Sequence, residues 1–130
     1  MPVVDASVVV EFLADGGGAD SAEERLQGEG HLLWAPQLLD AEVGHALRRA
    51  VRRGELDADS AGEALWKLDA LPLRRISHEL LVHSAWVLRE NVSFYDGLYV
   101  ALAEMLDEPL VTFDSRLARA GTAAQIEVLG

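Results

Sequence analysis

The sequence contains no cysteine, little proline and no long apolar run. The absence of cysteine excludes a disulfide framework and a zinc site built on thiolates. No apolar run approaches the roughly 20 residues that a membrane-spanning helix needs, and the N-terminus lacks the features of a signal peptide, so we expect a soluble, cytoplasmic protein. Only 4 of the 130 residues are proline and 50% are hydrophobic, a composition typical of packed proteins. We expect a single domain over residues 1–130, because no segment has the composition of a linker.

Positive charge is also scarce. The chain has 11 basic and 22 acidic residues, a formal net charge of −11, which argues against a broad basic surface for nucleic acid. A phosphoacceptor signalling domain, another small acidic α/β fold, needs a lysine late in the chain, whereas the one lysine here is Lys67. Clustered acids have a different use, because they can bind divalent cations that offset their charge and attract phosphate.

Short β-branched or apolar runs alternate with helical stretches. The expected strands are residues 2–4, 32–35, 73–76, 110–113 and 126–129. The expected helices are residues 8–13, 19–27, 36–53, a segment from Asp57 or Asp59 to 71, residues 77–90, a segment between Ser93 and Pro109, and residues 115–120. Ser7 is the expected N-cap of the first helix, and Gly28 and Gly30 are expected to close the second. The alternation predicts an α/β sandwich, with helices on both faces of a mainly parallel sheet of about five strands.

Four acidic residues occupy positions where such folds bind ligands. Ligands sit beyond the carboxyl ends of the strands in open α/β sheets. Asp5 directly follows the first expected strand, and Asp114 follows the strand at 110–113. Asp96 falls in the first turn of its helix, and Glu42 falls early in the 36–53 helix. These carboxylates are therefore candidates for one shared site.

Most of these acids also have a purely structural explanation. Ser93 and Asp96 fit the S-x-x-D capping box, in which the carboxylate bonds back to the Ser93 amide. Asp114 fits the N-cap of the last helix, and Asp5 fits a turn residue. Each acid alone is thus a weak indication of function.

The 36–53 helix offers two acids rather than one. Glu42 and Asp40 lie about equally far from the centre of the apolar face, on opposite flanks. Either is also compatible with a solvated helix surface. Periodicity leaves the choice between them open.

Four sequence blocks, in this order, resemble a VapC-type PIN domain over nearly the whole chain. The blocks are VVDAS at 3–7, LDAEV at 39–43 followed by ALRR at 46–49, YDGLYVALA at 95–103, and LVTFDSRL at 110–117. The resemblance implies a PIN-like three-layer sandwich. It also implies that Asp5, Glu42, Asp96 and Asp114 are the catalytic, metal-binding acids, which favours Glu42 over Asp40. Ser7 and Thr112 match small hydroxyl positions that support these carboxylates.

The same resemblance implies a function. VapC-type proteins are Mg²⁺- or Mn²⁺-dependent endoribonucleases, the toxins of type II toxin–antitoxin systems, so the implied partners are RNA, a VapB-like antitoxin and a second copy in a homodimer. An apolar groove that includes Phe12 and Leu13 is where we expect the antitoxin. The chain departs from the family at His45, where asparagine is common, and at Gly97, where alanine is commoner and glycine should weaken the helix.

Alternatives remain at this point. A PIN nuclease of RNA maturation without an antitoxin would carry the same acids, and a catalytically silent binding module could share the fold. Four arginines close together suit either RNA phosphates or the C-terminal end of a helix dipole: Arg48, Arg49, Arg52 and Arg53. The four histidines lack the spacing of a zinc helix and are not assigned as ligands: His31, His45, His78 and His83.

Overall fold

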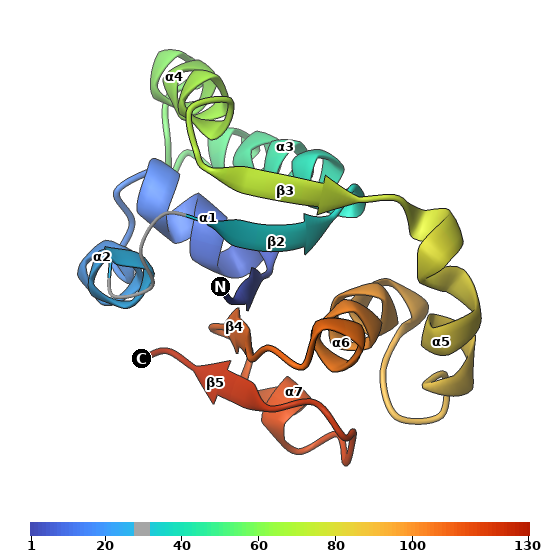
Figure 1. Cartoon of the computed structure of the whole chain (residues 1–130). Coiled ribbons are helices and arrows are strands. Elements are labelled where there is room, and N and C mark those ends of the chain that lie inside the picture. The colour runs from blue at the N-terminus through green and yellow to red at the C-terminus, as the bar shows by residue number, and fades with distance from the viewer. Residues whose placement is uncertain (28–31) are drawn as a thin grey trace.

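Five parallel strands form one sheet in the order β3-β2-β1-β4-β5 (Figure 1). The computed structural model describes residues 1–27 and 32–130, so Gly28, Gly30 and His31 lie outside the described residues. The strands are β1 (Val3–Val4), β2 (Leu33–Pro36), β3 (Leu73–Ile76), β4 (Leu110–Thr112) and β5 (Ile126–Val128). The predicted α/β fold is confirmed, with a sheet that is parallel throughout.

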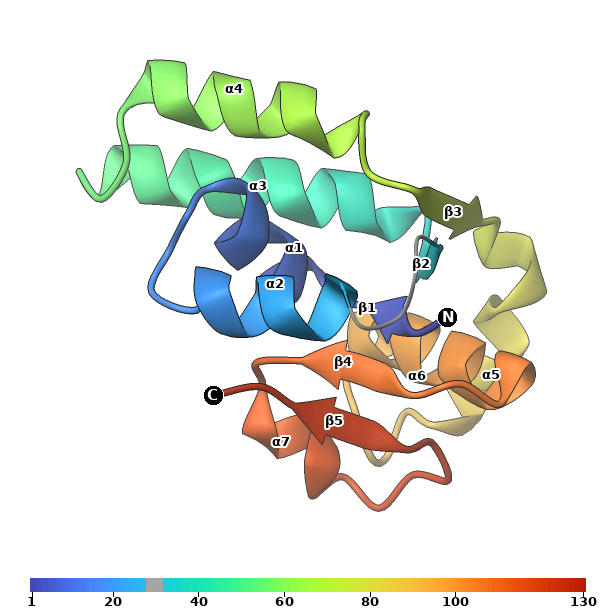
Figure 2. The ribbon, with the colours of Figure 1, turned by 60° about the vertical axis from the view of Figure 1, so that its left-hand side comes forward.

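Helices cover both faces of the sheet. They are α1 (Ala6–Leu13), α2 (Ala19–Gln27), α3 (Leu38–Arg52), α4 (Ala58–Leu68), the 3-10 helix η1 (His78–Leu80), α5 (Val82–Val87), α6 (Phe94–Leu106) and α7 (Ser115–Ala118). Helices α1 to α4 gather on one side and α5 and α6 on the other, while α7 packs beside β5 (Figure 2). None of these described helices is long and apolar enough to span a membrane.

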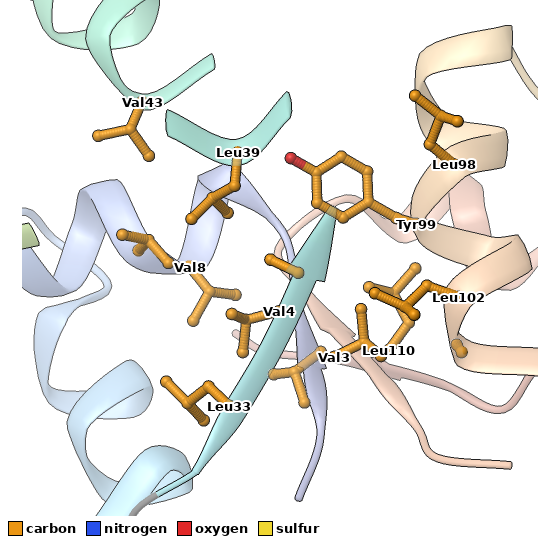
Figure 3. Close-up of a cluster of buried hydrophobic side chains, with 14 of the residues drawn as sticks. Val3, Val4, Val8, Leu33, Leu39, Val43, Leu98, Tyr99, Leu102 and Leu110 are labelled. Carbon is orange, nitrogen blue, oxygen red and sulfur yellow. The ribbon is translucent and has the colours of Figure 1, made fainter. Parts of the chain in front are cut away.

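The core lies where the central strands meet the two helical layers (Figure 3). Val3 and Val4 of β1 and Leu110 and Val111 of β4 have no exposed surface. Strands covered on both faces need apolar side chains on both faces, which explains why these short runs do not alternate with polar residues. Burying each such side chain contributes about 1.5–3 kcal/mol, and the central pair therefore fixes the sheet firmly.

The first helix begins earlier than expected. Its N-cap is Asp5, in extended backbone geometry, and the carboxylate accepts hydrogen bonds from the amides of Ser7 and Val8. The prediction that Ser7 is the cap is therefore wrong, because the carboxylate two residues earlier already satisfies the free amides of the first turn. This leaves the Ser7 hydroxyl available for other contacts.

The predicted helix at 77–90 is wrong as a single element. The chain forms η1 and then the six-residue α5, and the His78 Nε2 atom accepts a hydrogen bond from the Leu38 amide at 2.8 Å, at the start of α3. Ala85 of α5 packs against α6, where a Cβ on Gly97 would lie 3.1 Å from the Ala85 carbonyl oxygen. These long-range contacts override the local helix pattern, and the close approach gives Gly97 a packing reason.

Other element boundaries shift by a few residues. Asp57, not Asp59, caps α4 through the Ser60 amide at 2.9 Å, and α4 ends at Leu68. Helix α6 ends at Leu106, before Pro109, because Asp107 adopts a left-handed conformation with φ 52°.

Candidate active site

The carboxyl ends of β1 and β4 form the centre of the candidate site. These strands are neighbours, with Val4 opposite Val111. The chain proceeds from β1 to β2 and β3 on one side, then returns to β4 and β5 on the other, so the strand order reverses between β1 and β4. Crevices that bind ligands open at such a reversal. Asp5 and Asp114 follow these two strands at this position.

Asp5 is held in place by two hydroxyl groups as well as by the helix amides. Ser7 Oγ donates to Asp5 Oδ1, and Thr112 Oγ1 donates to Asp5 Oδ2. Ser7 Oγ in turn accepts from the Phe113 amide at 3.0 Å, and Thr112 Oγ1 accepts from the Asp114 amide at 3.0 Å. Because each hydroxyl receives a backbone proton, its own proton points to Asp5. The end of β4 thus fixes the carboxylate that follows β1.

The Asp5 carboxyl is partly buried and has no basic side chain as a partner in the described residues. Burial raises its pKa above the ordinary value, although the hydrogen bonds from Ser7, Thr112 and Val8 act in the opposite direction. Within residues 1–27 and 32–130, no basic side chain forms an ion pair with Asp5. Removing a carboxylate from water in this way raises the free energy of its ionised form unless a positive charge approaches it.

Asp96 and Asp114 approach the same edge from α6 and α7. The Asp96 amide donates to Ser93 Oγ at 3.1 Å, which forms the first half of the expected capping box, but in the described part of the chain no bond returns from its carboxylate to the Ser93 amide. Burial raises the pKa of Asp96, the Ser93 side chain lowers it and the Asp114 carboxylate raises it further. The effect of Asp114 on Asp96 shows that the two carboxylates are close enough to repel.

Asp114 differs because it has a cationic partner. It caps α7, and its carboxylate binds both the amide and the guanidinium of Arg116, with Nη2 at 2.7 Å from Oδ2. These hydrogen bonds hold the pKa of Asp114 below its ordinary value. Asp96, Asp114, Arg116 and Arg119 line a cavity of about 480 Å³. This cavity is mixed in charge.

A hydrogen bond from a tyrosine orients Glu42 at the site. The Tyr99 hydroxyl donates to Glu42 Oε1 at 2.6 Å, while Asp40 forms an ion pair with Arg75 at 2.6 Å, on the β3 side. Burial raises the pKa of Tyr99 far above its usual range, and the carboxylates of Glu42, Asp5 and Asp96 raise it further. The hydroxyl therefore keeps its proton. Of the two acids that periodicity leaves open, Glu42 is the one oriented toward the other carboxylates.

Sequence reasoning does not single out Tyr99, which looks like one more residue of an apolar helix face. A usable signal exists, since Tyr99 lies three residues after Asp96 and so shares its side of α6. A tyrosine beside a candidate acid has a hydroxyl that needs a partner once it is buried.

A larger cleft of about 510 Å³ adjoins these acids, with Ser7, Val10, Leu38, Glu42 and Arg49 among its lining residues. Arg48, Arg52 and Arg53 are exposed elsewhere on α3 and just after it. The α3 arginines are therefore split between the cleft wall and the outer surface.

The prediction of an apolar groove around Phe12 and Leu13 is only partly correct. Phe12 lines a separate pocket of about 400 Å³ with Leu26, Leu71 and Pro72. Leu13 is 6% exposed and belongs to the core, because its side chain faces inward from α1.

The donor chemistry of this edge suits a hard divalent cation, since Mg²⁺ and Mn²⁺ prefer carboxylate oxygens. Among the described residues, however, no group of three or more His, Asp or Glu side chains is arranged closely enough to hold an ion directly. Mg²⁺ commonly binds through one or two carboxylates and keeps several waters. The uncompensated Asp5 carboxylate and its neighbours fit that mode of binding.

The family model for the PIN domain matches residues 3–123. The chain belongs to the PIN-domain family. It is 50% identical over 129 residues to ribonuclease VapC1 of Mycobacterium tuberculosis, a match that covers 98% of this chain and 96% of that relative. This similarity places the present PIN domain among the VapC-type members.

Solved structures show the same fold. VapC20 of Mycobacterium tuberculosis, described as a toxin that cleaves the sarcin–ricin loop, aligns with a TM-score of 0.73 at 19% identity and covers 100% of both chains. VapBC2 of Rickettsia felis, solved with a DNA fragment from its promoter, aligns with a TM-score of 0.72 at 13% identity over 98% of each chain. At these identities the structural similarity supports the fold of the PIN domain alone.

Proposed function

We propose that this PIN domain is a Mg²⁺- or Mn²⁺-dependent endoribonuclease that acts as the toxin of a type II toxin–antitoxin system and blocks translation by hydrolysing RNA. One observation carries the proposal: the partly buried carboxylate of Asp5, which forms no ion pair with a basic side chain in the described residues, lies at the strand reversal, with Glu42, Asp96 and Asp114 around it. The ribonuclease names of the VapC relatives support the same conclusion.

In this proposal Asp5 and Asp96 bind the cation, Glu42 binds it directly or through water, and Asp114 completes the shell or polarises the attacking water. The cation supplies charge stabilisation at the phosphate and a lowered pKa for a bound water. Water is the nucleophile, rather than the ribose 2′-hydroxyl. Ser7 and Thr112 keep both oxygens of Asp5 in a fixed orientation. The Arg116 ion pair keeps Asp114 ionised.

The proposed macromolecular partners follow from the family and from the charge. A toxin–antitoxin complex from Klebsiella pneumoniae has the same fold, and we extend that pairing to a VapB-like antitoxin for this chain. A net charge of −11 suits an antitoxin segment with basic side chains that reach the acids. The 510 Å³ cleft beside Glu42 is the proposed position of that segment. Homodimerisation and a cytoplasmic location belong to the same proposal.

Cleavage of total bacterial RNA by the purified, antitoxin-free protein tests this function. We expect discrete cuts with Mg²⁺ or Mn²⁺ that disappear with EDTA and in Asp96→Asn, whose fold is checked by circular dichroism. Cuts that persist in EDTA would contradict metal dependence. A folded wild type that neither cuts RNA nor binds Mn²⁺ would favour a silent binding module. Active protein without a small antitoxin gene upstream would favour a nuclease of RNA maturation.

A further inference from the structure

A hydrogen bond between Tyr99 and Glu42 joins the two helical layers at the candidate site. Glu42 lies on α3, in one layer, and Tyr99 lies on α6, in the other, 57 residues away along the chain. Figure 3 shows the Tyr99 ring extending from α6 toward Leu39 and the start of α3, with its oxygen at the leading end. The bond from the hydroxyl to Glu42 Oε1 measures 2.6 Å.

The donor in this pair is rigid, whereas the acceptor is not. Tyr99 is 2% exposed and is the largest of the fully buried side chains, so its ring cannot turn away. Glu42 is only partly buried, lines the 510 Å³ cleft and has no other hydrogen bond from the described residues. A glutamate side chain that is free to rotate loses conformational entropy when a ligand fixes it. Tyr99 fixes this side chain before any ligand arrives.

We propose that Tyr99 is a positioning residue, whose hydroxyl holds one oxygen of Glu42 and leaves the other available for the divalent cation or its water shell. This inference rests on the proposed function. Partners that orient metal ligands in this way typically change metal affinity or activity by 10–100-fold when they are removed. The Tyr99 hydroxyl, rather than its ring, should carry such an effect.

Tyr99→Phe separates the hydroxyl from the ring, because the phenylalanine ring still fills the core. Tyr95→Phe is the matched control for Mn²⁺ binding: Tyr95 lies one turn earlier on α6, is 62% exposed and lines the 510 Å³ cleft, but its hydroxyl has no hydrogen bond to any described residue. We would measure Mn²⁺ binding by isothermal titration calorimetry for wild type, both tyrosine variants, Glu42→Gln and Tyr99→Phe/Glu42→Gln. The Mn²⁺ concentration needed for half-maximal RNA cleavage gives a second readout.

We expect Tyr99→Phe to weaken Mn²⁺ binding by about 10-fold, with Tyr95→Phe within about 2-fold of wild type. Tyr99→Phe should cut RNA at nearly the wild-type rate once Mn²⁺ saturates, and it should add nothing to the loss in Glu42→Gln. Unchanged binding in folded Tyr99→Phe would overturn the inference. The inference would also be overturned if Tyr99→Phe weakened Mn²⁺ binding by the same factor in the wild-type protein and in Glu42→Gln.

Failure of the proposed function itself has a different signature. In that case wild type neither binds Mn²⁺ nor cuts RNA, and the positioning role falls with it. If wild type binds and cuts but Tyr99→Phe matches it, only the positioning role fails. Thermal unfolding of each variant shows whether the core is intact, and a Tyr99→Phe protein that loses affinity only because it has unfolded would also contradict the inference.

Discussion

The ends of β1 and β4 are built on one local plan and yet differ in their electrostatics. Each strand is buried and is followed by an aspartate that caps the next helix. Asp5 accepts from the amide two residues later at 3.0 Å, and Asp114 does the same at 2.9 Å. The capping hydrogen bond is therefore nearly the same at the two positions, although ψ is 175° at Asp5 and 102° at Asp114.

Their surroundings separate the two carboxylates. Asp5 is partly buried, is bound by two neutral hydroxyls and has a raised pKa, whereas Asp114 is paired with the exposed Arg116 and has a lowered pKa. A cation that reaches the site would stabilise Asp5 strongly, because no basic side chain in the described residues forms an ion pair with it. At Asp114 the same cation has to compete with a guanidinium. The local motif places an acid at the strand end, and the tertiary environment decides what that acid can bind.

The largest expected difference is in RNA cleavage. Asp5→Asn should reduce cleavage by more than about 100-fold, beyond the loss expected for a supporting residue, because Asp5 has no basic partner within residues 1–27 and 32–130. Asp114→Asn should have the smaller effect, since Arg116 already neutralises that acid. Rates measured on one RNA at saturating Mn²⁺ would make the comparison.

The two asparagine variants control for each other, because each keeps an oxygen that can cap its helix. Circular dichroism and thermal unfolding should therefore show folded proteins. Equal losses of RNA cleavage in the two variants would contradict the contrast between the strand ends. A folded Asp5→Asn protein that cleaves at the wild-type rate would show that Asp5 is not part of the active site.

Thr112→Val should have an intermediate effect and would sharpen the contrast. The substitution keeps the shape but removes the hydroxyl that donates to Asp5 and accepts from the Asp114 amide. We expect cleavage to fall by about 10-fold or more. Thr122→Val is the control, since Thr122 has no side-chain hydrogen bond to the described residues and lines none of the clefts at the site. Similar rates in both variants would show that orientation of Asp5 matters little.

The smallest expected effect is on the pH dependence of the free energy of unfolding in the absence of metal. Folding raises the pKa of Asp5. The contribution of Asp5 to the free energy of unfolding is therefore fully present below its ordinary pKa of 3.8 and is lost as pH rises through its pKa in the folded protein. In EDTA, Asp5→Asn should therefore gain free energy of unfolding relative to wild type as pH rises from about 4 through the folded pKa of Asp5. Urea unfolding at each pH measures this difference.

Asp114 should behave in the opposite way. Its pKa is lowered, so its contribution is present above its ordinary value of 3.8 and is lost as pH falls through the folded value. Asp114→Asn should accordingly lose stability relative to wild type near neutral pH and recover toward wild type in acid. The same direction of change in both variants would contradict the comparison.

The sequence alone predicts the strands and their order of appearance well, because short β-branched runs and bounding turns are local signals. It also places Asp5 and Asp114 at strand ends, since each directly follows its strand in the chain. The wrong predictions arise where other residues compete for the same hydrogen bonds, which a local sequence pattern does not show. Ser7 looks like a cap until Asp5 takes that role, and residues 77–90 look like one helix until His78 binds the start of α3.

The choice between Asp40 and Glu42 shows the limit most clearly. On the helix they are nearly equivalent, and only family resemblance favours Glu42. In the structure Arg75 binds Asp40 and Tyr99 binds Glu42, through contacts that span 35 and 57 residues. Periodicity along one helix carries no information about partners that far away.

The sequence by itself therefore determined the α/β class, the acids at the strand ends and the resemblance to the VapC-type PIN domain. The tertiary structure alone decided that Ser7 and Thr112 bind the Asp5 carboxylate, that Asp114 is neutralised by Arg116, and that Tyr99 holds Glu42. The physical reason is that secondary structure follows from neighbours in the chain, whereas the charge state and orientation of a carboxylate depend on burial and on partners that the fold brings from distant segments.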